Sequence, residues 1–355
     1  MANTVAAERG GYTQDRALYA STQQPYTSTT IKQYVPLTCH GHSRPVPHLS
    51  FSDFVGADPS EYYMISACKD SNPMLRDGIT GDWIGTFFGH KGAVWQARLS
   101  PDASYAATAS ADFTAKVWNT FTGETLWTIK HDHIVRAVAF PQHGCPEANN
   151  LLATGGFDKQ LRIFDLSSLP RAVNGEAVEV TASQGFKVGE GVHKGWIKSA
   201  IFTHDPNIII TTCDDKIVRW FDIASRTVIQ EFQTDGAIGS CEFNTSASSI
   251  YREFGSPHDD IGNGHPVLCV AAGKAVYFYG GIQARTLLKS VVLPYEVASV
   301  ALHTQQRKFV VGGSQDNNTW ARVYNYDDAK EIGVFFPIFL RSVPFLQTGV
   351  MSWTM

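Results

Sequence analysis

One short apolar pattern recurs six times along the chain, and this repeat constrains the fold more than any other feature. In each occurrence an aliphatic residue is followed three positions later by a small or apolar residue, and two positions after that by another apolar residue. Successive occurrences begin 41 to 62 residues apart. They are Val46/Leu49/Phe51, Val94/Ala97/Leu99, Val135/Val138/Phe140, Ile197/Ala200/Phe202, Ile238/Cys241/Phe243 and Val297/Val300/Leu302.

Each occurrence is followed by further short apolar runs, such as Ala106–Ser110 and Ala115–Trp118 in the second unit. These runs are too short for helices and are separated by turn-forming residues, so they predict strands. Three or four strands per unit of roughly 40–45 residues is typical of a propeller blade. Only 17% of residues are charged, and 12% are aromatic, which also favours short strands. The sequence therefore predicts an all-β propeller with six recognisable blades.

A histidine precedes the first strand in four units, and an aspartate lies in the turn before the third strand. The aspartate follows its histidine by 22 to 28 residues. In the second unit Ser110 and Trp118 accompany the pair. The pattern resembles the WD-repeat family, in which a buried Asp–His–Ser/Thr–Trp network holds each blade. The resemblance implies a structural network of His42, Asp70, His90, Ser110, Asp112, Trp118, His131, Asp158, His193 and Asp215.

The residues His90, Asp112 and Ser110 are also the three types of a nucleophilic triad. Recurrence of the same pair in four units favours the structural interpretation, because an active site has no reason to repeat. A buried polar group left unpaired costs about 1–3 kcal/mol, so such pairs fix turns. We therefore expect no catalytic residues and no enzymatic activity.

A closer resemblance is carried by the stretches PLTCHGHSRPV, SACKDSNPMLRDGITGDWIGTFFGHKGAVW, ATASADFTAKVWNTFTGETLWTIKHDHIVRAVAF and LLATGGFDKQLRIFDL. They resemble the family of the serine/threonine kinase receptor-associated protein, also called the Unr-interacting protein. The similarity extends from about Pro36 to about Gly333. The block running from ACKD to GHKGAVW is specific to this family, since ordinary WD repeats seldom share it.

The resemblance implies a non-enzymatic, seven-bladed scaffold for protein–protein interactions. Its members associate with the survival-of-motor-neuron complex, which loads Sm proteins onto spliceosomal small nuclear RNAs. The expected partners are therefore Sm-type, Gemin-type and mRNA-binding proteins, in the cytoplasm and also in the nucleus, with roles in mRNA splicing and processing. Two alternatives stay open: a translation-initiation scaffold similar to a propeller subunit of the third initiation factor complex, and a signalling adaptor for receptor kinases.

The chain departs from the family pattern outside the repeats. Residues 1–35 are polar and predict a disordered extension, whereas 36–333 form the predicted propeller. Residues 334–355 are an atypical apolar tail in place of a seventh repeat, so the last blade is expected to be incomplete. We interpret the tail as a splice or gene-model variant of a seven-bladed parent. The long connections Pro170–Gly191 and Asn244–Pro266 predict surface loops.

Binding residues are expected on one face of the propeller, beside the start of each first strand and before each structural aspartate. Aromatic residues and arginine are enriched at interaction hot spots. Basic residues dominate these positions in a chain of net charge -4, and Asp214 is the acidic exception, which favours an acidic peptide or an RNA–protein partner. The predicted partner-binding residues are Lys69, Trp95, Arg136, Phe157, Trp196, Lys198 and Gln315.

Other chemistry has little support in the sequence. The chain contains no GxxxxGK[ST], GxGxxG or HExxH motif and no CxxC pair, so we expect no cofactor, metal or small-molecule substrate. Cys68 and Cys213 take the place of Ser110 in their units and predict inert buried thiols. No apolar run reaches the roughly 18 residues that a membrane helix needs, so we expect no membrane partner. Direct RNA contact is left undecided by the sequence.

Overall fold

The computed structural model describes residues 39–52, 61–141, 150–170, 176–243, 261–262, 265–304, 306–314 and 321–335. The chain divides into the units Met1–Leu37 and Thr38–Met355, and every described residue belongs to the second. The predicted extension 1–35, Gln315 and tail residues 336–355 lie outside the described residues. The predicted domain boundaries therefore stay predictions.

The described residues form six sheets, one for each repeat of the apolar pattern, and their strand pairs are antiparallel except that of β8 (Thr125–Lys130) with an added strand, β12 (Val178–Thr181). The first three contain β1 (His48–Phe51), β2 (Tyr63–Ala67), β3 (Met74–Asp77) and β4 (Trp83–Thr86); β5 (Val94–Leu99), β6 (Tyr105–Ser110), β7 (Thr114–Asn119) and β8 (Thr125–Lys130); and β9 (Val135–Ala139), β10 (Leu151–Gly156), β11 (Leu161–Asp165) and β13 (Phe186–Val188). The last three contain β14 (Ile197–Phe202), β15 (Ile208–Cys213), β16 (Ile217–Asp222) and β17 (Thr227–Gln233); β18 (Ile238–Phe243), β19 (Leu268–Ala272), β20 (Ala275–Gly280) and β21 (Thr286–Val292); and β22 (Glu296–His303), β23 (Lys308–Ser314), β24 (Ala321–Asn325) and β25 (Glu331–Phe335).

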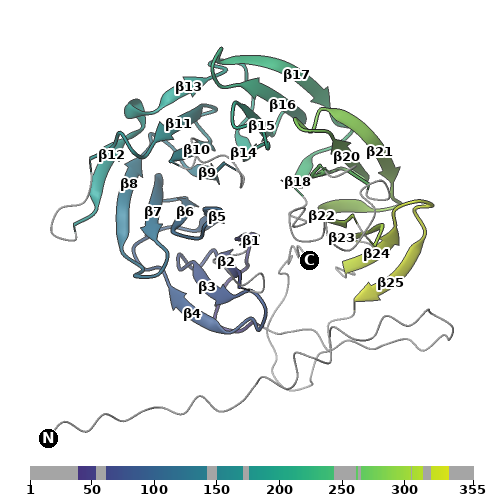
Figure 1. Cartoon of the computed structure of the whole chain (residues 1–355), viewed down its shortest axis with the longest axis horizontal. Helices are drawn as coiled ribbons and strands as arrows, with labels where there is room; N and C mark the ends of the chain where they lie inside the picture. Colours follow the sequence, from purple (N-terminus) through teal and green to yellow (C-terminus); the bar gives the residue numbers. More distant parts are fainter. Residues whose placement is uncertain are drawn as a thin grey trace, which may run out of the picture. The chain divides into compact units, whose positions relative to one another are not determined.

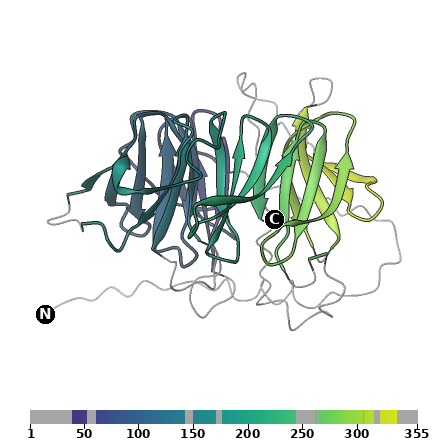
Figure 2. The same ribbon diagram turned by 90° about the horizontal axis from the view of Figure 1, so that it is seen from above.

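The six sheets stand around a common axis, with the first strand of each sheet innermost (Figure 1). Seen at right angles, the strands run roughly parallel to that axis (Figure 2). This is the predicted all-β propeller, with six blades present. The sixth sheet has its four strands, and no seventh sheet occurs within the described ranges. No helix in these ranges is long and apolar enough to cross a bilayer.

The sheets are held together by apolar side chains buried between neighbours. One cluster joins Ile65 and Leu75 of the first sheet to Val94 and Ala97 of the second, and all four are almost fully buried. Burying an aliphatic side chain of this size contributes roughly 1.5–3 kcal/mol. Each sheet packs in this way against the next, whereas the strands of the sixth and first sheets make no comparable contact among the described residues.

A β-bulge explains the unusual spacing of the apolar pattern. In β5, Val94 pairs with Ser110 while Gln96 pairs with Ala109, so Trp95 is an extra residue. In a regular strand, residues three positions apart face opposite sides of the sheet. The extra residue shifts this alternation by one position, so Val94 and Ala97 face the same side. The same register shift occurs where β9, β14, β18 and β22 begin.

The connection Pro170–Gly191 is not only a surface loop, and the prediction is wrong for its second half. Strand β12 (Val178–Thr181) adds to β8 in parallel, and β13 completes the third sheet. The physical reason is visible in the segment itself: Val180 and Val188 are buried, and both outer strands offered free backbone groups. The connection therefore joins the second and third sheets, because one of its strands pairs with each of them.

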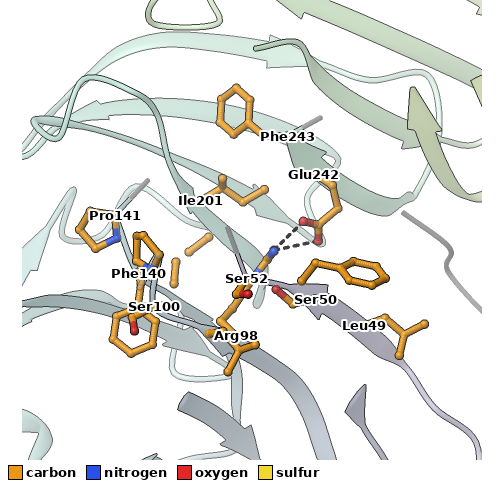
Figure 3. Close-up of a pocket in the computed structure, with 15 residues that line it drawn as sticks. Leu49, Ser50, Ser52, Arg98, Ser100, Phe140, Pro141, Ile201, Glu242 and Phe243 are labelled. Atoms are coloured by element: carbon orange, nitrogen blue, oxygen red, sulfur yellow. Dashed lines mark hydrogen bonds and ion pairs between the residues drawn. The ribbon is translucent and has the colours of Figure 1, made fainter. Parts of the chain in front are cut away.

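A polar network crosses the axis and links sheets that are not neighbours. Nη2 of Arg98 in β5 lies 2.7 Å from Oε2 of Glu242 in β18 (Figure 3). The Nε2 atom of His48 in β1 lies 3.1 Å from Oε1 of the same carboxylate. Nε2 of Gln96 lies 3.4 Å from Nε2 of His48, and Oε1 of Gln96 accepts a hydrogen bond from the Val138 amide. These contacts, called the cross-axis tie below, connect the first, second and fifth sheets directly.

The charge state of the cross-axis tie follows from its surroundings. Although burial opposes ionisation, Arg98 and His48 hold the pKa of Glu242 below its usual range. Burial, aided by the positive charge of Arg98, lowers the pKa of His48. The tie is therefore an arginine–carboxylate ion pair with a neutral imidazole as a third member.

We expect the cross-axis tie to contribute measurable stability, because removing one member leaves a poorly hydrated charge. Arg98→Met and Glu242→Gln should each lower the free energy of unfolding by roughly 2–4 kcal/mol, and the double variant should lose at least about 1 kcal/mol less than the sum. Urea denaturation of the four proteins measures this coupling. The control is Lys130 and Glu179, an ion pair with side chains 52% and 67% exposed, whose coupling should stay below about 1 kcal/mol. Additive losses at Arg98 and Glu242 would contradict the tie.

Candidate functional site

The first two sheets contain the predicted histidine–aspartate contacts. Nδ1 of His90 lies 2.8 Å from Oδ2 of Asp112, and Nδ1 of His42 lies 3.1 Å from Oδ2 of Asp70. The same carboxylate oxygen of Asp112 also accepts a hydrogen bond from the Lys91 amide. Each aspartate thereby joins the loop before the first strand to the turn before the third.

The hydroxyl that completes the network in the second sheet is Thr108, not Ser110. Nε2 of His90 lies 2.7 Å from Oγ1 of Thr108, and Nε1 of Trp118 donates to the same oxygen at 2.8 Å. Ser110 instead donates to the Gly92 carbonyl and accepts from the Asp112 amide. Thr108 and Ser110 are two positions apart on β6 and face the same side, so the sequence alone could not tell which of them the imidazole meets.

In the third and fourth sheets the prediction is wrong: among the described residues, His131 makes no hydrogen bond to Asp158 and His193 makes none to Asp215, because both aspartates pair with arginines. Asp215 forms an ion pair of 2.8 Å with Arg219, and Asp158 pairs with Arg162. His193 keeps a contact of 2.9 Å with Oγ1 of Thr211, but its Nδ1 atom has no partner within the described part of the chain. Sequence reasoning missed these arginines. The signal was an arginine four residues after the aspartate, where the second sheet has Lys116.

These groups are arranged as structural contacts rather than as a reactive site. Burial lowers the pKa of His90, so its ring is neutral and hydrogen-bonded at both nitrogens. No hydrogen bond joins Ser110 to His90 in the described residues, and the hydroxyl that does meet the imidazole, that of Thr108, is fully buried. The serine is instead engaged with backbone groups of two neighbouring turns.

One group of side chains, His42, Cys68 and Asp70, lies close enough together to hold a metal ion. Burial raises the pKa of Cys68 to about 11, and its thiol donates to the Arg44 carbonyl at 3.0 Å. Both ring nitrogens of His42 also have protein partners, Asp70 and Ser66. A protonated thiol is a poor metal ligand, because metals bind the thiolate. The group therefore serves the first sheet as the His90 network serves the second.

Thr108→Val tests which hydroxyl completes the network. The substitution keeps the shape but leaves His90 and Trp118 without their shared partner, so the free energy of unfolding should fall by roughly 2 kcal/mol or more. Ser110→Ala should cost less, since its two contacts are 3.2 Å long. Urea denaturation followed by tryptophan fluorescence measures both. A larger loss for Ser110→Ala would contradict the assignment.

The histidines also predict how stability depends on pH. Burial lowers the pKa of His193 to about 4. Burial also lowers the pKa of His131 to about 4, although the negative charge of Asp158 acts in the opposite direction. In the unfolded chain histidine has a pKa of about 6.5, so the unfolded state binds more protons between these values. Stability should therefore be fully present near pH 7 and fall as the pH drops from about 6.5 towards 4.

Denaturation midpoints measured across this pH range test the linkage. His193→Gln can still hydrogen-bond Thr211 but does not titrate, so its profile should be flatter than that of the unaltered chain. Substitution of the exposed His133 by Gln is the matched control and should leave the slope unchanged. An identical slope in the His193→Gln protein would contradict the role assigned to this group.

Six of the seven predicted partner-binding residues lie together on one face, and we call them the cation–indole ladder: Lys69, Trp95, Arg136, Phe157, Trp196 and Lys198. Along this ladder Lys69 lies 5.0 Å from the centre of the Trp95 ring, and Arg136 lies 4.5 Å from Trp95 and 4.6 Å from Trp196. Lys198 lies 5.5 Å from Trp196, and Phe157 packs on the same indole at 4.3 Å between ring centres. Gln315 lies outside the described residues.

The β-bulges place the ladder where it is. Trp95, Arg136 and Lys198 are the extra residues of β5, β9 and β14, and a bulge turns its extra side chain away from the sheet faces. The corresponding positions in the fifth and sixth sheets are Gly239 and Ala298. A Cβ on Gly239 would lie 2.3 Å from the Ala298 carbonyl, so these two sheets approach too closely for a ladder residue.

The ladder carries more positive charge than its surroundings neutralise. Lys198 forms an ion pair of 3.1 Å with Asp214, whose pKa is held low by Trp196 and by that lysine. Among the described residues, Lys69 and Arg136 have no carboxylate partner. Partial burial lowers the pKa of Arg136, and the charge of Asp214 acts in the opposite direction. The guanidinium is thus a half-buried cation stacked on aromatic rings instead of being paired with an acid.

The stacked four-stranded sheets and their histidine–aspartate contacts define a WD-repeat propeller, a class of protein-binding scaffolds. The family described as WD domain, G-beta repeat matches residues 81–119, 123–165 and 190–222. The chain is 41% identical over 307 residues to the serine-threonine kinase receptor-associated protein of Mus musculus, an alignment that spans 85% of this chain and 75% of that protein.

The protein of the same name from Dictyostelium discoideum is 37% identical over 300 residues, spanning 84% of this chain and 87% of that protein. This chain therefore belongs to the serine-threonine kinase receptor-associated protein family, as its sequence predicted. Subunit I of eukaryotic translation initiation factor 3 from Kluyveromyces lactis is more distant, at 24% identity over 262 residues, 62% of this chain and 71% of that subunit.

Proposed function

We propose that this chain is a non-enzymatic scaffold that holds protein components of an RNA–protein assembly, with the cation–indole ladder as a contact face. The observation that carries the proposal is the convergence of three cations and three aromatic rings from the first four sheets at one face. Aromatic side chains and arginine supply much of the binding energy at protein interfaces. His42, Asp70, His90 and Asp112 of the first two sheets are instead engaged in internal contacts.

The family suggests which assembly. We propose that the chain acts in the survival-of-motor-neuron complex, during the loading of Sm proteins onto small nuclear RNAs and hence in mRNA splicing and processing. Its expected partners are Sm-type, Gemin-type and mRNA-binding proteins. A protein with this role works in the cytoplasm and has access to the nucleus.

A translation-initiation scaffold is the second candidate, supported by the 24% identity to the initiation factor subunit. The lower identity makes it the weaker of the two. A signalling adaptor is the third, supported by the name of the relatives, which refers to receptor kinases.

Affinity capture of the tagged full chain, followed by mass spectrometry, separates the candidates. The first predicts enrichment of Sm and Gemin-type proteins, the second of initiation factor subunits and the 40S ribosome, and the third of receptor kinases. The double reversal Arg136→Glu with Lys198→Glu should reduce capture of the specific partners at least about ten-fold, because it replaces attraction by repulsion. Its melting temperature should remain close to that of the unaltered chain.

The matched control reverses two lysines that are not part of the ladder, Lys187 and Lys330, whose side chains are exposed. It makes the same change in net charge and should leave capture intact. Equal capture by both double variants would remove the ladder from the interface. Turnover of a substrate that a single substitution abolishes would overturn the scaffold itself.

A further inference from the structure

The position of Arg136 at the middle of the ladder suggests what kind of ligand the ladder recognises. Its guanidinium lies 4.5 Å from the centre of one indole ring and 4.6 Å from the other. The stacking restricts the plane of the guanidinium, and its N–H groups point outward from the edge of that plane. No described residue accepts a hydrogen bond from these groups. The Arg136 guanidinium is therefore a pair of oriented hydrogen-bond donors, called the fork below, without an acceptor among the described residues.

The energetics of the site favour an anion at this fork. Taking a cation partly out of water costs free energy, and here the cost is offset by the rings and not by an acid. The lowered pKa of Arg136 reports the same imbalance. Planar guanidinium groups bind carboxylates and phosphates through two parallel hydrogen bonds, which are stronger than neutral ones. Lys69 and Lys198 lie beyond the two indoles and extend the positive charge to both sides.

The chemistry of the rings separates an acidic peptide from RNA. Single-stranded nucleic acids are bound mainly by stacking of bases on exposed aromatic rings along a basic groove. In the ladder, Trp95 already has two cationic neighbours, and Trp196 has two cations and Phe157. Both indoles are only partly exposed, and a base would have to compete with these neighbours for their faces.

We propose that the cation–indole ladder is a docking surface for an extended acidic peptide segment of a partner protein, with Arg136 as the fork that binds a carboxylate and Lys69 and Lys198 as flanking charges. The inference rests on the proposed scaffold function and specifies its ligand. Carboxylates of an extended peptide repeat on one side every second residue, about 7 Å apart, so one segment can meet several cations in a row. At that end of the ladder, Asp214 already pairs with Lys198 and adds a negative charge.

Fluorescence anisotropy with the purified full chain tests the proposal. The probes are a labelled peptide of alternating Glu and Ser, the same peptide with Gln for Glu, and a single-stranded RNA of similar length. The Glu peptide should bind at least about ten-fold more tightly than either other probe, and its affinity should fall as salt is raised. RNA binding equal to or tighter than peptide binding would overturn the choice of ligand.

Two variants of the fork and one control test its geometry. Arg136→Gln should weaken binding of the Glu peptide roughly ten-fold or more, and Arg136→Lys should recover only part of the loss, because lysine keeps the charge without the fork. Arg226→Lys is the control: Arg226 also lies over a ring, that of Phe186, but outside the ladder. Melting temperatures show whether each variant is folded. Full affinity in the folded Arg136→Lys protein would overturn the fork.

Comparison with affinity capture separates this inference from the proposed function. If charge reversal at Arg136 and Lys198 abolishes capture of cellular partners but the Glu peptide does not bind, the contact face stands and the acidic-peptide ligand is wrong. If reversal changes neither capture nor peptide binding, both proposals fail.

Discussion

Burial of anchors between neighbouring sheets is the interaction on which the rest of the structure depends, where the anchor is the first aliphatic residue of each apolar repeat, such as Val94. A four-stranded sheet with two apolar faces cannot be stable alone, so each blade needs the next. The anchor Val94 and the small Ala97 can both reach the first sheet only because β5 carries an extra residue between them. The same bulge turns Trp95 outward, so one backbone irregularity both allows the core to pack and places a residue of the ladder.

The polar contacts act within this apolar frame. A buried imidazole is acceptable because it is neutral and hydrogen-bonded, as in the contact of His90 with Asp112 and Thr108. Where an arginine pairs with the aspartate, as Arg219 does with Asp215, the histidine loses that partner, and burial lowers the pKa of His193 to about 4. The blades thus share one architecture but differ in how their turns are fixed.

The two ends of the row of sheets do not pack on each other within the described part of the chain, and the cross-axis tie compensates in part. Glu242 in the fifth sheet contacts both Arg98 of the second and His48 of the first. Its side chain is 19% exposed and that of Arg98 is 16% exposed, so the ion pair is only weakly screened by solvent. The tie restrains sheets whose apolar faces never meet.

The sequence by itself predicted the six sheets and the histidine–aspartate contacts of the first two, because apolar periodicity and turn residues are local signals. It also determined the ladder residues, since their places relative to each strand repeat. The tertiary structure decided which hydroxyl meets His90, which aspartates pair with arginine and how β12 joins β8. It alone revealed that Arg98 and Glu242, each four positions after its anchor, form an ion pair. The contact of Arg98 with Glu242 joins two sheets that meet only across the axis, and no local pattern encodes that distance. The contacts of His90 and Asp215 depend on which neighbouring side chain of the same sheet points towards them.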